Sequence, residues 1–227
     1  MGRVELDNMI KAIFWDNDGV LVDTEILYYQ ACRETFASVG IDLDENLYIE
    51  YFLKQGTGTW HLAEQKGINK EEIIKLRNER NETYSNLLKD NARVIDGAEE
   101  TLKKLYGKFS MGVVTSSRED HFNIIHQKNS LLKYFDFVLT SDDYTKTKPS
   151  PAPYLKAVAK TGLNKEECIV IEDSERGLRA ALIAGLKCYV IPTSLTKYSD
   201  FSGAEKILNN ISEVPKLLIR SFSNSQN

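Results

Sequence analysis

Two aspartates lie two positions apart directly after an apolar run near the start of the chain. Asp16 and Asp18 follow residues 12–15, Ala-Ile-Phe-Trp, a run typical of a buried strand. The carboxylate of Asp16 can attack phosphorus as a nucleophile, and Asp18 is placed to transfer a proton at the leaving group. Gly19 permits a backbone conformation in which the chain turns sharply away. The pattern indicates carboxylate chemistry at the end of a strand.

Polar side chains also follow three further apolar runs of the chain. The run at 111–115 ends on Thr115 and is followed by Ser116 and Ser117. The run at 168–171 is followed by Glu172 and Asp173, and the loop after the run at 137–140 contains Lys148. Taken singly, each has a structural explanation, since Ser117 with Asp120 can be a helix N-cap pair. Ligands of open parallel α/β sheets bind beyond the carboxyl ends of the strands. The joint pattern therefore favours one shared site.

The residue types at these strand ends suit the transfer of a phosphoryl group. Carboxylates from two strand ends, those of Asp16 and Asp173, can meet as an oxygen site for Mg²⁺. The hydroxyl of Thr115 can bind phosphate oxygens, and the amine of Lys148 supplies a fixed positive charge against the developing negative charge. These residues predict an enzyme whose substrate is a small phosphorylated metabolite.

Short β-rich apolar runs alternate with helix-length segments over most of the chain. The expected strands are 11–15, 111–115, 137–140, 168–171 and 187–191, and the expected helices are 98–106, 118–127, 153–161 and 175–184, the last with Gly185 at its C-cap. Such alternation predicts an α/β protein with a mostly parallel, doubly wound sheet.

Residues 24–92 interrupt this alternation. They contain long charged helical patterns, such as 71–89, but no convincing set of strands. We expect an inserted helical cap domain over 24–92 and a core domain formed by 1–23 and 93–220. Residues 221–227 are polar, which predicts a disordered tail.

The composition of the 227-residue chain excludes several classes of protein. The net charge is −4 and the Lys and Arg residues are dispersed, unlike the basic surface of a nucleic-acid-binding protein. No apolar run approaches the roughly 18 residues of a membrane span, and charged residues near the N-terminus occupy the place of a signal peptide's apolar stretch. We expect a cytoplasmic protein without nucleic-acid or membrane partners. No feature of the sequence specifies an oligomeric state.

With these residues in view, the chain resembles the haloacid dehalogenase superfamily of phosphotransferases, in the subclass with a helical cap after the first strand. Four segments are similar to its motifs, in the expected order: DNDGVLVDTE at 16–25, VVTSS at 113–117, KPSP at 148–151 and IEDSERGLRAALIAG at 171–185. The resemblance covers nearly the whole chain. It implies a five-stranded Rossmann-like core, the cofactor Mg²⁺ and an aspartyl-phosphate intermediate.

The resemblance also implies a role for each matching residue. Asp16 is the nucleophile and a metal ligand, Asp18 the acid and base and a metal ligand through its backbone carbonyl, Lys148 the charge stabiliser, Asp173 a metal ligand, and Glu172 a support of the metal site. Phosphate or substrate binding is expected of Thr115, Ser116, Ser117, Arg118 and, in the cap, Arg80. The cap would close over the substrate and exclude water.

Two alternatives stand beside a phosphatase. A phosphosugar mutase resembling beta-phosphoglucomutase shares the core residues and the cap type, but it carries a histidine where this chain has Tyr28, and residues 53–61 lack its cap arginine. A non-catalytic phospho-acceptor resembling a response-regulator receiver also combines acids, Thr and Lys, but places its acid pair before the acceptor aspartate. We therefore expect a Mg²⁺-dependent phosphomonoester hydrolase.

Overall fold

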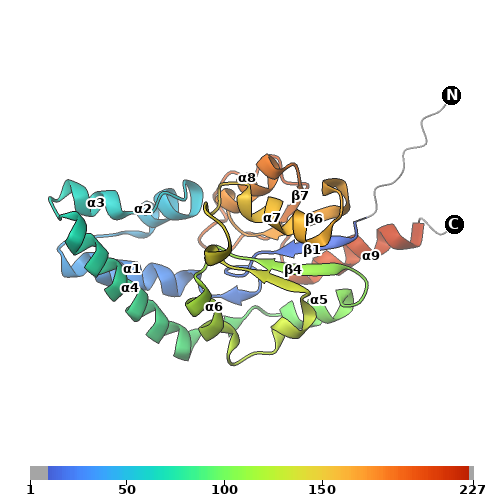
Figure 1. Ribbon diagram of the computed structural model, residues 1–227, viewed down its shortest axis with the longest axis horizontal. Helices are drawn as coiled ribbons and strands as arrows, with labels where there is room; N and C mark the ends of the chain where they lie inside the picture. Colours follow the sequence, from blue (N-terminus) through green and yellow to red (C-terminus); the bar gives the residue numbers. More distant parts are fainter. Residues whose placement is uncertain (1–9, 225–227) are drawn as a thin grey trace.

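A six-stranded sheet forms the centre of the molecule (Figure 1). The computed structural model describes residues 10–224, with side chains through residue 219. The strand order is β5-β4-β1-β6-β7-β8, and every neighbouring pair is parallel. The strands are β1 (Ala12–Trp15), β4 (Ser110–Val114), β5 (Phe137–Leu139), β6 (Cys168–Glu172), β7 (Lys187–Val190) and β8 (Lys206–Ile207). The predicted α/β class with a parallel sheet is confirmed.

The sheet has one strand more than the five expected. All five predicted strands are present within a residue or two of their expected ends, and β8 adds a sixth at the edge beside β7. β8 has only two residues, and both are exposed. A pair of exposed residues carries no apolar run, so the sequence pattern could not reveal it.

Helices cover both faces of the sheet (Figure 1). The alternating side chains of β1 divide the core, because Ile13 and Trp15 belong to one apolar cluster and Phe14 to the other. The first cluster is covered by α5 (Ala98–Leu105), α6 (Glu119–His126) and α9 (Val214–Asn224), and the second by α7 (Ala152–Thr161) and α8 (Glu175–Ala184). Gly185 ends α8 in the left-handed conformation, with φ of 80°, as its C-cap position predicts.

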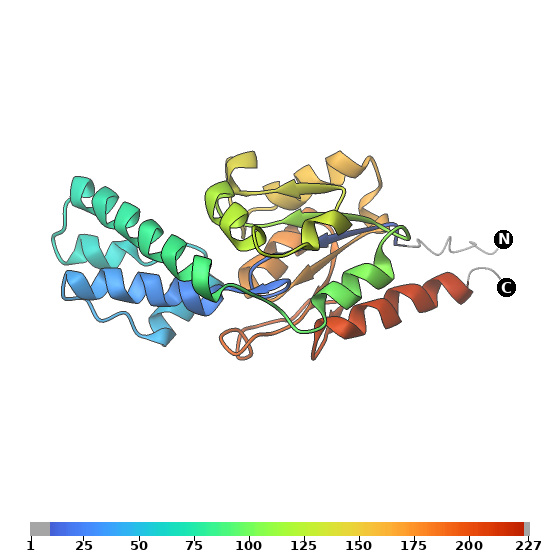
Figure 2. The same ribbon diagram turned by 90° about the horizontal axis from the view of Figure 1, so that it is seen from below.

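Residues 24–92 form a helical lobe at one end of the sheet, which we call the cap (Figures 1 and 2). It contains α1 (Glu25–Ser38), α2 (Glu45–Tyr48), the π-helix η1 (Ile49–Lys54), α3 (Trp60–Gln65) and α4 (Lys70–Asn91). Buried side chains such as Phe36, Leu43 and Leu53 give it an apolar cluster, to which Leu195 of the core also belongs. The chain passes between core and cap twice, and the two crossing segments form a pair of short antiparallel strands, β2 (Val22–Asp23) and β3 (Arg93–Val94).

Helix α9 extends further toward the C-terminus than the sequence predicts. The tail predicted at 221–227 is wrong for residues 221–224, which continue α9; residues 225–227 and 1–9 lie outside the described part of the chain. Buried Val214 and Leu218 anchor α9, and each further residue of an anchored helix adds a hydrogen bond at little cost.

Short 3₁₀-helices lie at Leu131–Tyr134 (η2), Ser141–Asp143 (η3), Lys165–Glu167 (η4) and Ile211–Glu213 (η5). Within residues 10–224 no helix has the length and apolar character needed to cross a bilayer.

Gly112 in β4 lies opposite Phe137 in β5 and leaves space for its ring. A Cβ at Gly112 would lie 2.2 Å from the ring of Phe137. We expect Gly112→Ala to lower the free energy of unfolding by about 1–3 kcal/mol, because such overpacking outweighs the conformational gain of alanine. Chemical denaturation in urea measures the effect. In Gly112→Ala/Phe137→Leu the smaller side chain makes room, so the double variant should lose less than the sum of the single variants; additive losses would contradict the steric explanation.

Candidate active site

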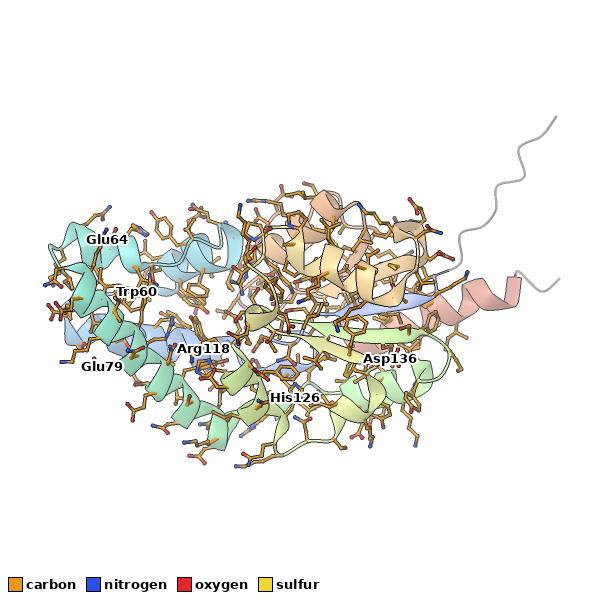
Figure 3. The ribbon with its side chains drawn as sticks, in the orientation of Figure 1. Trp60, Glu64, Glu79, Arg118, His126 and Asp136 are labelled. Carbon is orange, nitrogen blue, oxygen red and sulfur yellow. The ribbon has the colours of Figure 1, made fainter. Side chains whose placement is uncertain are left out.

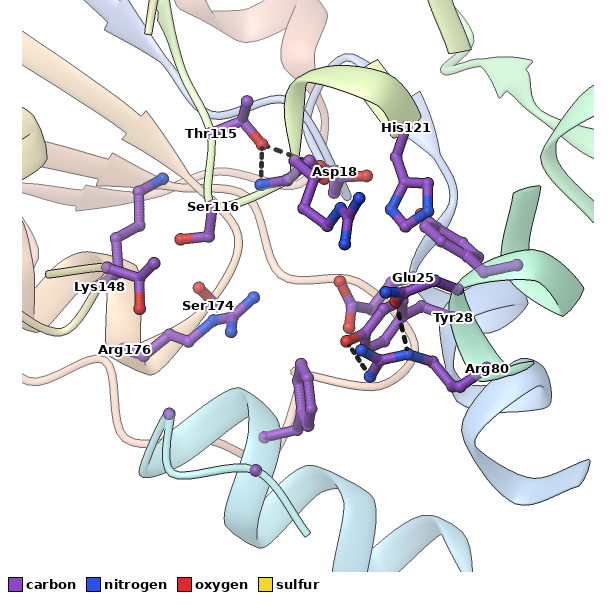
Figure 4. Close-up of a pocket in the computed structure, with 18 of the residues that line it drawn as sticks. Asp18, Glu25, Tyr28, Arg80, Thr115, Ser116, His121, Lys148, Ser174 and Arg176 are labelled. Atoms are coloured by element: carbon purple, nitrogen blue, oxygen red, sulfur yellow. Dashed lines mark hydrogen bonds between the residues drawn. The ribbon is translucent and has the colours of Figure 1, made fainter. Parts of the chain in front are cut away.

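A cavity of about 310 Å³ lies between the cap and the carboxyl ends of the core strands (Figure 4). Asp16 and Asp18 line it from the end of β1, which is flanked by β4 and β6. β4 and β5 lie on one side of β1, whereas β6, β7 and β8 lie on its other side. The strand order therefore reverses at β1. This is the position at which open α/β sheets bind ligands.

Lys148 forms the centre of a buried charge cluster. Its Nζ lies 2.6 Å from Oδ1 of Asp16 and 2.7 Å from Oε1 of Glu172, and it donates a third hydrogen bond to the carbonyl of Val114 at 2.9 Å. The side chain is only 2% exposed. The ammonium group thus donates all three of its hydrogens to acceptors on or just after β1, β4 and β6, and these bonds fix its charge beside Asp16.

Glu172 is held on both carboxylate oxygens. Oε1 accepts from Tyr154 at 2.6 Å as well as from Lys148, and Oε2 accepts from the hydroxyl of Ser174 at 3.1 Å. Burial would raise the pKa of Glu172, but Lys148 and the hydrogen bonds bring it below its usual value. Gly177 makes room for this group, because a Cβ there would lie 2.0 Å from the carboxylate carbon. Glu172 therefore remains ionised and anchors Lys148.

Asp16 and Asp173 share an excess of negative charge. Burial raises the pKa of Asp16 to about 7, against the opposing effect of Lys148. Burial, with Glu172 and Asp16 nearby, raises the pKa of Asp173 well above its usual value. Possible ligand oxygens of Asp16, Glu172 and Asp173 lie within 4.8 Å of one another. Three carboxylates around one ammonium favour a divalent cation.

The geometry around Asp173 suits such a cation. Its buried Oδ2 has no hydrogen-bond partner among the described residues. Gly19 adopts φ of 84°, and a Cβ at this position would lie 2.4 Å from Oδ2 of Asp173. The sharp turn predicted at Gly19 is therefore present, and it brings the loop after β1 against the loop after β6. An unpaired carboxylate oxygen beside Asp16 fits the predicted metal site.

Asp18 belongs to a separate hydrogen-bond system. Oδ2 accepts from the hydroxyls of Thr115 at 3.0 Å and Ser117 at 2.8 Å, and Oδ1 accepts from Thr24 (Figure 4). None of these three donors bonds to Asp16 or Asp173, so the Asp18 carboxylate has partners of its own. This separation matches the different tasks expected of the two aspartates.

The residues expected to bind phosphate all line the cavity, but they differ in their present partners. Thr115 and Ser117 donate to Asp18, whereas the buried hydroxyl of Ser116 has no partner among the described residues. Arg118 lies at the junction of cap and core (Figure 3) and binds Asp120 through two hydrogen bonds of 2.8 and 3.0 Å. Ser116 therefore offers the unpaired hydroxyl of this group.

Arg80 brings a positive charge from the cap. It donates to the hydroxyl of Tyr28 and, at 3.0 Å, to Oδ1 of Asn81, and its guanidinium lies 4.8 Å from the centroid of the Tyr28 ring. Arg77 stacks over Trp60 at 5.2 Å. Both arginines line the cavity, and neither has a carboxylate partner among residues 10–219. This wall of the cavity carries unneutralised positive charge.

Several residues that line the cavity were missed in the sequence, among them Glu25, His121 and Arg176. The strand-end argument considered only the residues directly after each strand, whereas these three lie on the following helices. Glu25 and Arg176 do fall inside two of the motif-like segments, DNDGVLVDTE and IEDSERGLRAALIAG. A search extended to the first turn of the helix that follows each strand would have found Arg176 in α8 and His121 in α6.

Comparisons with known proteins agree with this arrangement. The haloacid dehalogenase-like hydrolase family matches residues 13–191. The phosphorylated carbohydrates phosphatase of Thermotoga maritima is 32% identical over 218 residues, 90% of this chain and 100% of that protein. Fructose-1-phosphate phosphatase YqaB of Escherichia coli is 27% identical over 177 residues, 77% of this chain and 92% of that protein.

A solved structure extends the likeness to three dimensions. A mutant of CbbY from Rhodobacter sphaeroides, in complex with xylulose-(1,5)bisphosphate, has a TM-score of 0.76 and 26% identity, and the match covers 90% of this chain and 96% of that chain. The family match covers most of the sequence, and the phosphatase relative spans nearly all of it. The predicted enzyme class is therefore confirmed, and the chain belongs to the haloacid dehalogenase-like hydrolase family.

Proposed function

We propose that the protein is a Mg²⁺-dependent phosphomonoester hydrolase that works through a phosphorylated Asp16. The observation that carries this proposal is the position of Asp16, held by Lys148 beside the unpaired oxygen of Asp173 while Asp18 lies in its own set of hydroxyl donors. A nucleophile and a proton carrier thus share one cavity without sharing partners.

The first step forms a bond between an Asp16 oxygen and phosphorus and breaks the ester bond of the substrate. Lys148 holds Oδ1 of Asp16, which leaves the other oxygen for attack, and its charge stabilises the phosphoryl oxygens. Asp18, in its protonated form, gives its proton to the departing alkoxide. The products of this step are the free alcohol and an aspartyl-phosphate.

In the second step water replaces Asp16 on phosphorus. Asp18, now a carboxylate, accepts a proton from that water, the bond between Asp16 and phosphorus breaks, and inorganic phosphate leaves. Asp16 is regenerated as a carboxylate and Asp18 as an acid, so atoms and protons balance over the cycle. Thr115, Ser117 and Thr24 keep Asp18 in place for both transfers.

The ligands proposed for Mg²⁺ are Asp16, Asp173 and the backbone carbonyl of Asp18, with Glu172 as a support. A bound magnesium ion supplies positive charge to the phosphoryl oxygens and to the crowded carboxylates. The support for this assignment is the unpaired Oδ2 of Asp173 and the spacing of the acidic oxygens.

For the substrate we propose a small phosphorylated metabolite of the sugar phosphate kind. Relatives are named for phosphorylated carbohydrates and for fructose 1-phosphate. The unpaired Arg77 and Arg80 suit an anionic group on the cap side of the cavity. The cytoplasmic location expected from the sequence stays a prediction.

The mutase alternative is less well supported by the cavity. Tyr28 lines the cavity where the mutase carries its histidine, and it hydrogen-bonds Arg80. Burial raises the pKa of Tyr28 above its usual value, so this side chain stays protonated and does not act as a base at neutral pH. Water is then the better candidate for the acceptor. The receiver alternative is opposed by the match to a hydrolase family.

The nucleophile is tested with p-nitrophenyl phosphate. The wild type should hydrolyse it with Mg²⁺ and lose activity in EDTA, and Asp16→Asn should reduce kcat by roughly 10⁴-fold or more because no phosphoenzyme can form. Asp90→Asn, an exposed change on α4, is the matched control and should retain wild-type rates. Comparable turnover in Asp16→Asn would exclude Asp16 as the nucleophile.

The metal site is tested by thermal unfolding. Mg²⁺ should raise the Tm of the wild type, since a ligand at a hundred times its Kd contributes about 2.7 kcal/mol to the stability of the folded state. Asp173→Asn removes a repelling charge, so without Mg²⁺ it should unfold at a higher temperature than the wild type, and Mg²⁺ should no longer raise its Tm. An undiminished Mg²⁺ shift in Asp173→Asn would show that the ion binds elsewhere.

The role of Asp18 is tested by leaving-group dependence. A p-nitrophenolate leaves without a proton, so Asp18→Asn should release about one equivalent per enzyme in a fast burst and then turn over roughly 10²-fold more slowly than the wild type. With an alkyl phosphate, which needs the proton, the burst itself should be lost. Rapid-mix absorbance and a phosphate assay separate the two steps. Equal, burst-free losses on both esters would argue against a proton carrier at Asp18.

A further inference from the structure

Glu25 and Arg176 face one another across the cavity (Figure 4). Glu25 is the first residue of α1 in the cap, and Arg176 lies in the first turn of α8 in the core. Each affects the pKa of the other through its charge, yet no ion pair joins them or joins Arg176 to another carboxylate in the described part of the chain. Two opposite charges thus flank the space that a substrate would occupy.

The Glu25 carboxylate is buried, being 8% exposed, and has one fixed partner. Tyr48 donates its hydroxyl to Oε1, which leaves acceptor positions on the cavity side. Burial raises the pKa of Glu25, and the nearby Arg176 opposes that effect. A buried carboxylate with unused acceptor positions favours hydrogen-bond donors from a ligand.

The Arg176 guanidinium is positioned by stacking. It lies 5.6 Å from the centroid of the Phe52 ring, and Phe52 stacks on Tyr48 with a centroid distance of 5.2 Å and an interplanar angle of 9°. The buried Nε of Arg176 has no hydrogen-bond partner among the described residues. The aromatic pair Tyr48 and Phe52 therefore positions both charged groups, and Arg176 keeps unused donors.

The sign of the charges limits what can bind between them. An additional anionic group would be repelled by Glu25, and a cationic group would be repelled by Arg176. A hydroxyl suits both, since it can donate to the carboxylate and accept from the guanidinium at once. Hydrogen bonds of this kind to charged groups are among the stronger ones.

We propose that Glu25 and Arg176 together bind hydroxyl groups of the substrate and so select a polyhydroxylated phosphomonoester, a sugar or polyol phosphate. The inference rests on the proposed function, because it places the hydroxyls beside a phosphoryl group at Asp16. It assigns the hydroxyl-binding pair to one residue of the cap and one of the core. The packing of the cap against the core brings the two halves of this subsite to one cavity.

The test compares hydroxylated and hydroxyl-free substrates. Initial rates with Mg²⁺ are measured on p-nitrophenyl phosphate and on a panel of pentose, hexose and polyol phosphates for the wild type, Glu25→Gln and Arg176→Gln. For the best hydroxylated substrate, kcat/KM should fall in each variant about 10- to 100-fold more than it falls for p-nitrophenyl phosphate. Arg179→Gln, an exposed change on the same helix, controls for effects on α8.

Deoxy analogues of the best substrate separate recognition from a structural role. Removing the contacted hydroxyl should cost the wild type a similar factor, and Glu25→Gln should show little further loss on that analogue, because the interaction is already gone. The inference would be overturned if the variants lost kcat/KM equally on all substrates, with the loss from the variant multiplying the loss from the deoxy change. It would also be overturned if the wild type preferred p-nitrophenyl phosphate to every hydroxylated ester. A wild type that hydrolyses no phosphomonoester at all would instead refute the proposed function.

Discussion

The buried ammonium of Lys148 is the interaction on which the site depends. It lies between Asp16 and Glu172 and reaches the carbonyl of Val114, so it joins the ends of three adjacent strands. Without it, several carboxylates would face each other in a water-poor interior, and removing one partner of such a buried pair costs about 3–5 kcal/mol. One cation does not balance three carboxylates, and the remaining charge is what makes the site receptive to a metal ion.

The sheet makes this cluster possible because it fixes the spacing of the strand ends. β1 pairs with β4 on one side and β6 on the other, with Trp15 opposite Val113 and Ile171. The residues that follow these positions therefore lie beside each other without any long-range adjustment. Two glycines leave space for the acidic side chains, because a Cβ at Gly19 would collide with Asp173 and a Cβ at Gly177 would collide with Glu172. Small residues at these points are a steric requirement of the charge cluster.

The cap contributes a different kind of chemistry. Its side of the cavity is largely aromatic and basic, with Trp60 and Tyr28 stacked against Arg77 and Arg80, and Glu25 is its buried acid. The cap joins the core through two short crossings, and its buried Leu27, Ala31, Tyr84 and Leu88 pack into the same apolar cluster as side chains of the core. The groups proposed for the reaction thus lie in the core, and those proposed to bind the rest of the substrate lie where the core meets the cap.

The sequence by itself determined the parallel α/β class, the five main strands and the grouping of Asp16, Asp18, Thr115, Lys148 and Asp173 at one sheet edge, because strand periodicity and strand-end position are local properties of a chain. It could not show β8, the continuation of α9 past residue 221, or the division between Asp18 with its hydroxyl donors and the Lys148 cluster. Only the tertiary structure brought Glu25 opposite Arg176. Their meeting depends on how the cap packs over the core, which is a contact between segments some 150 residues apart and not a local property of either segment.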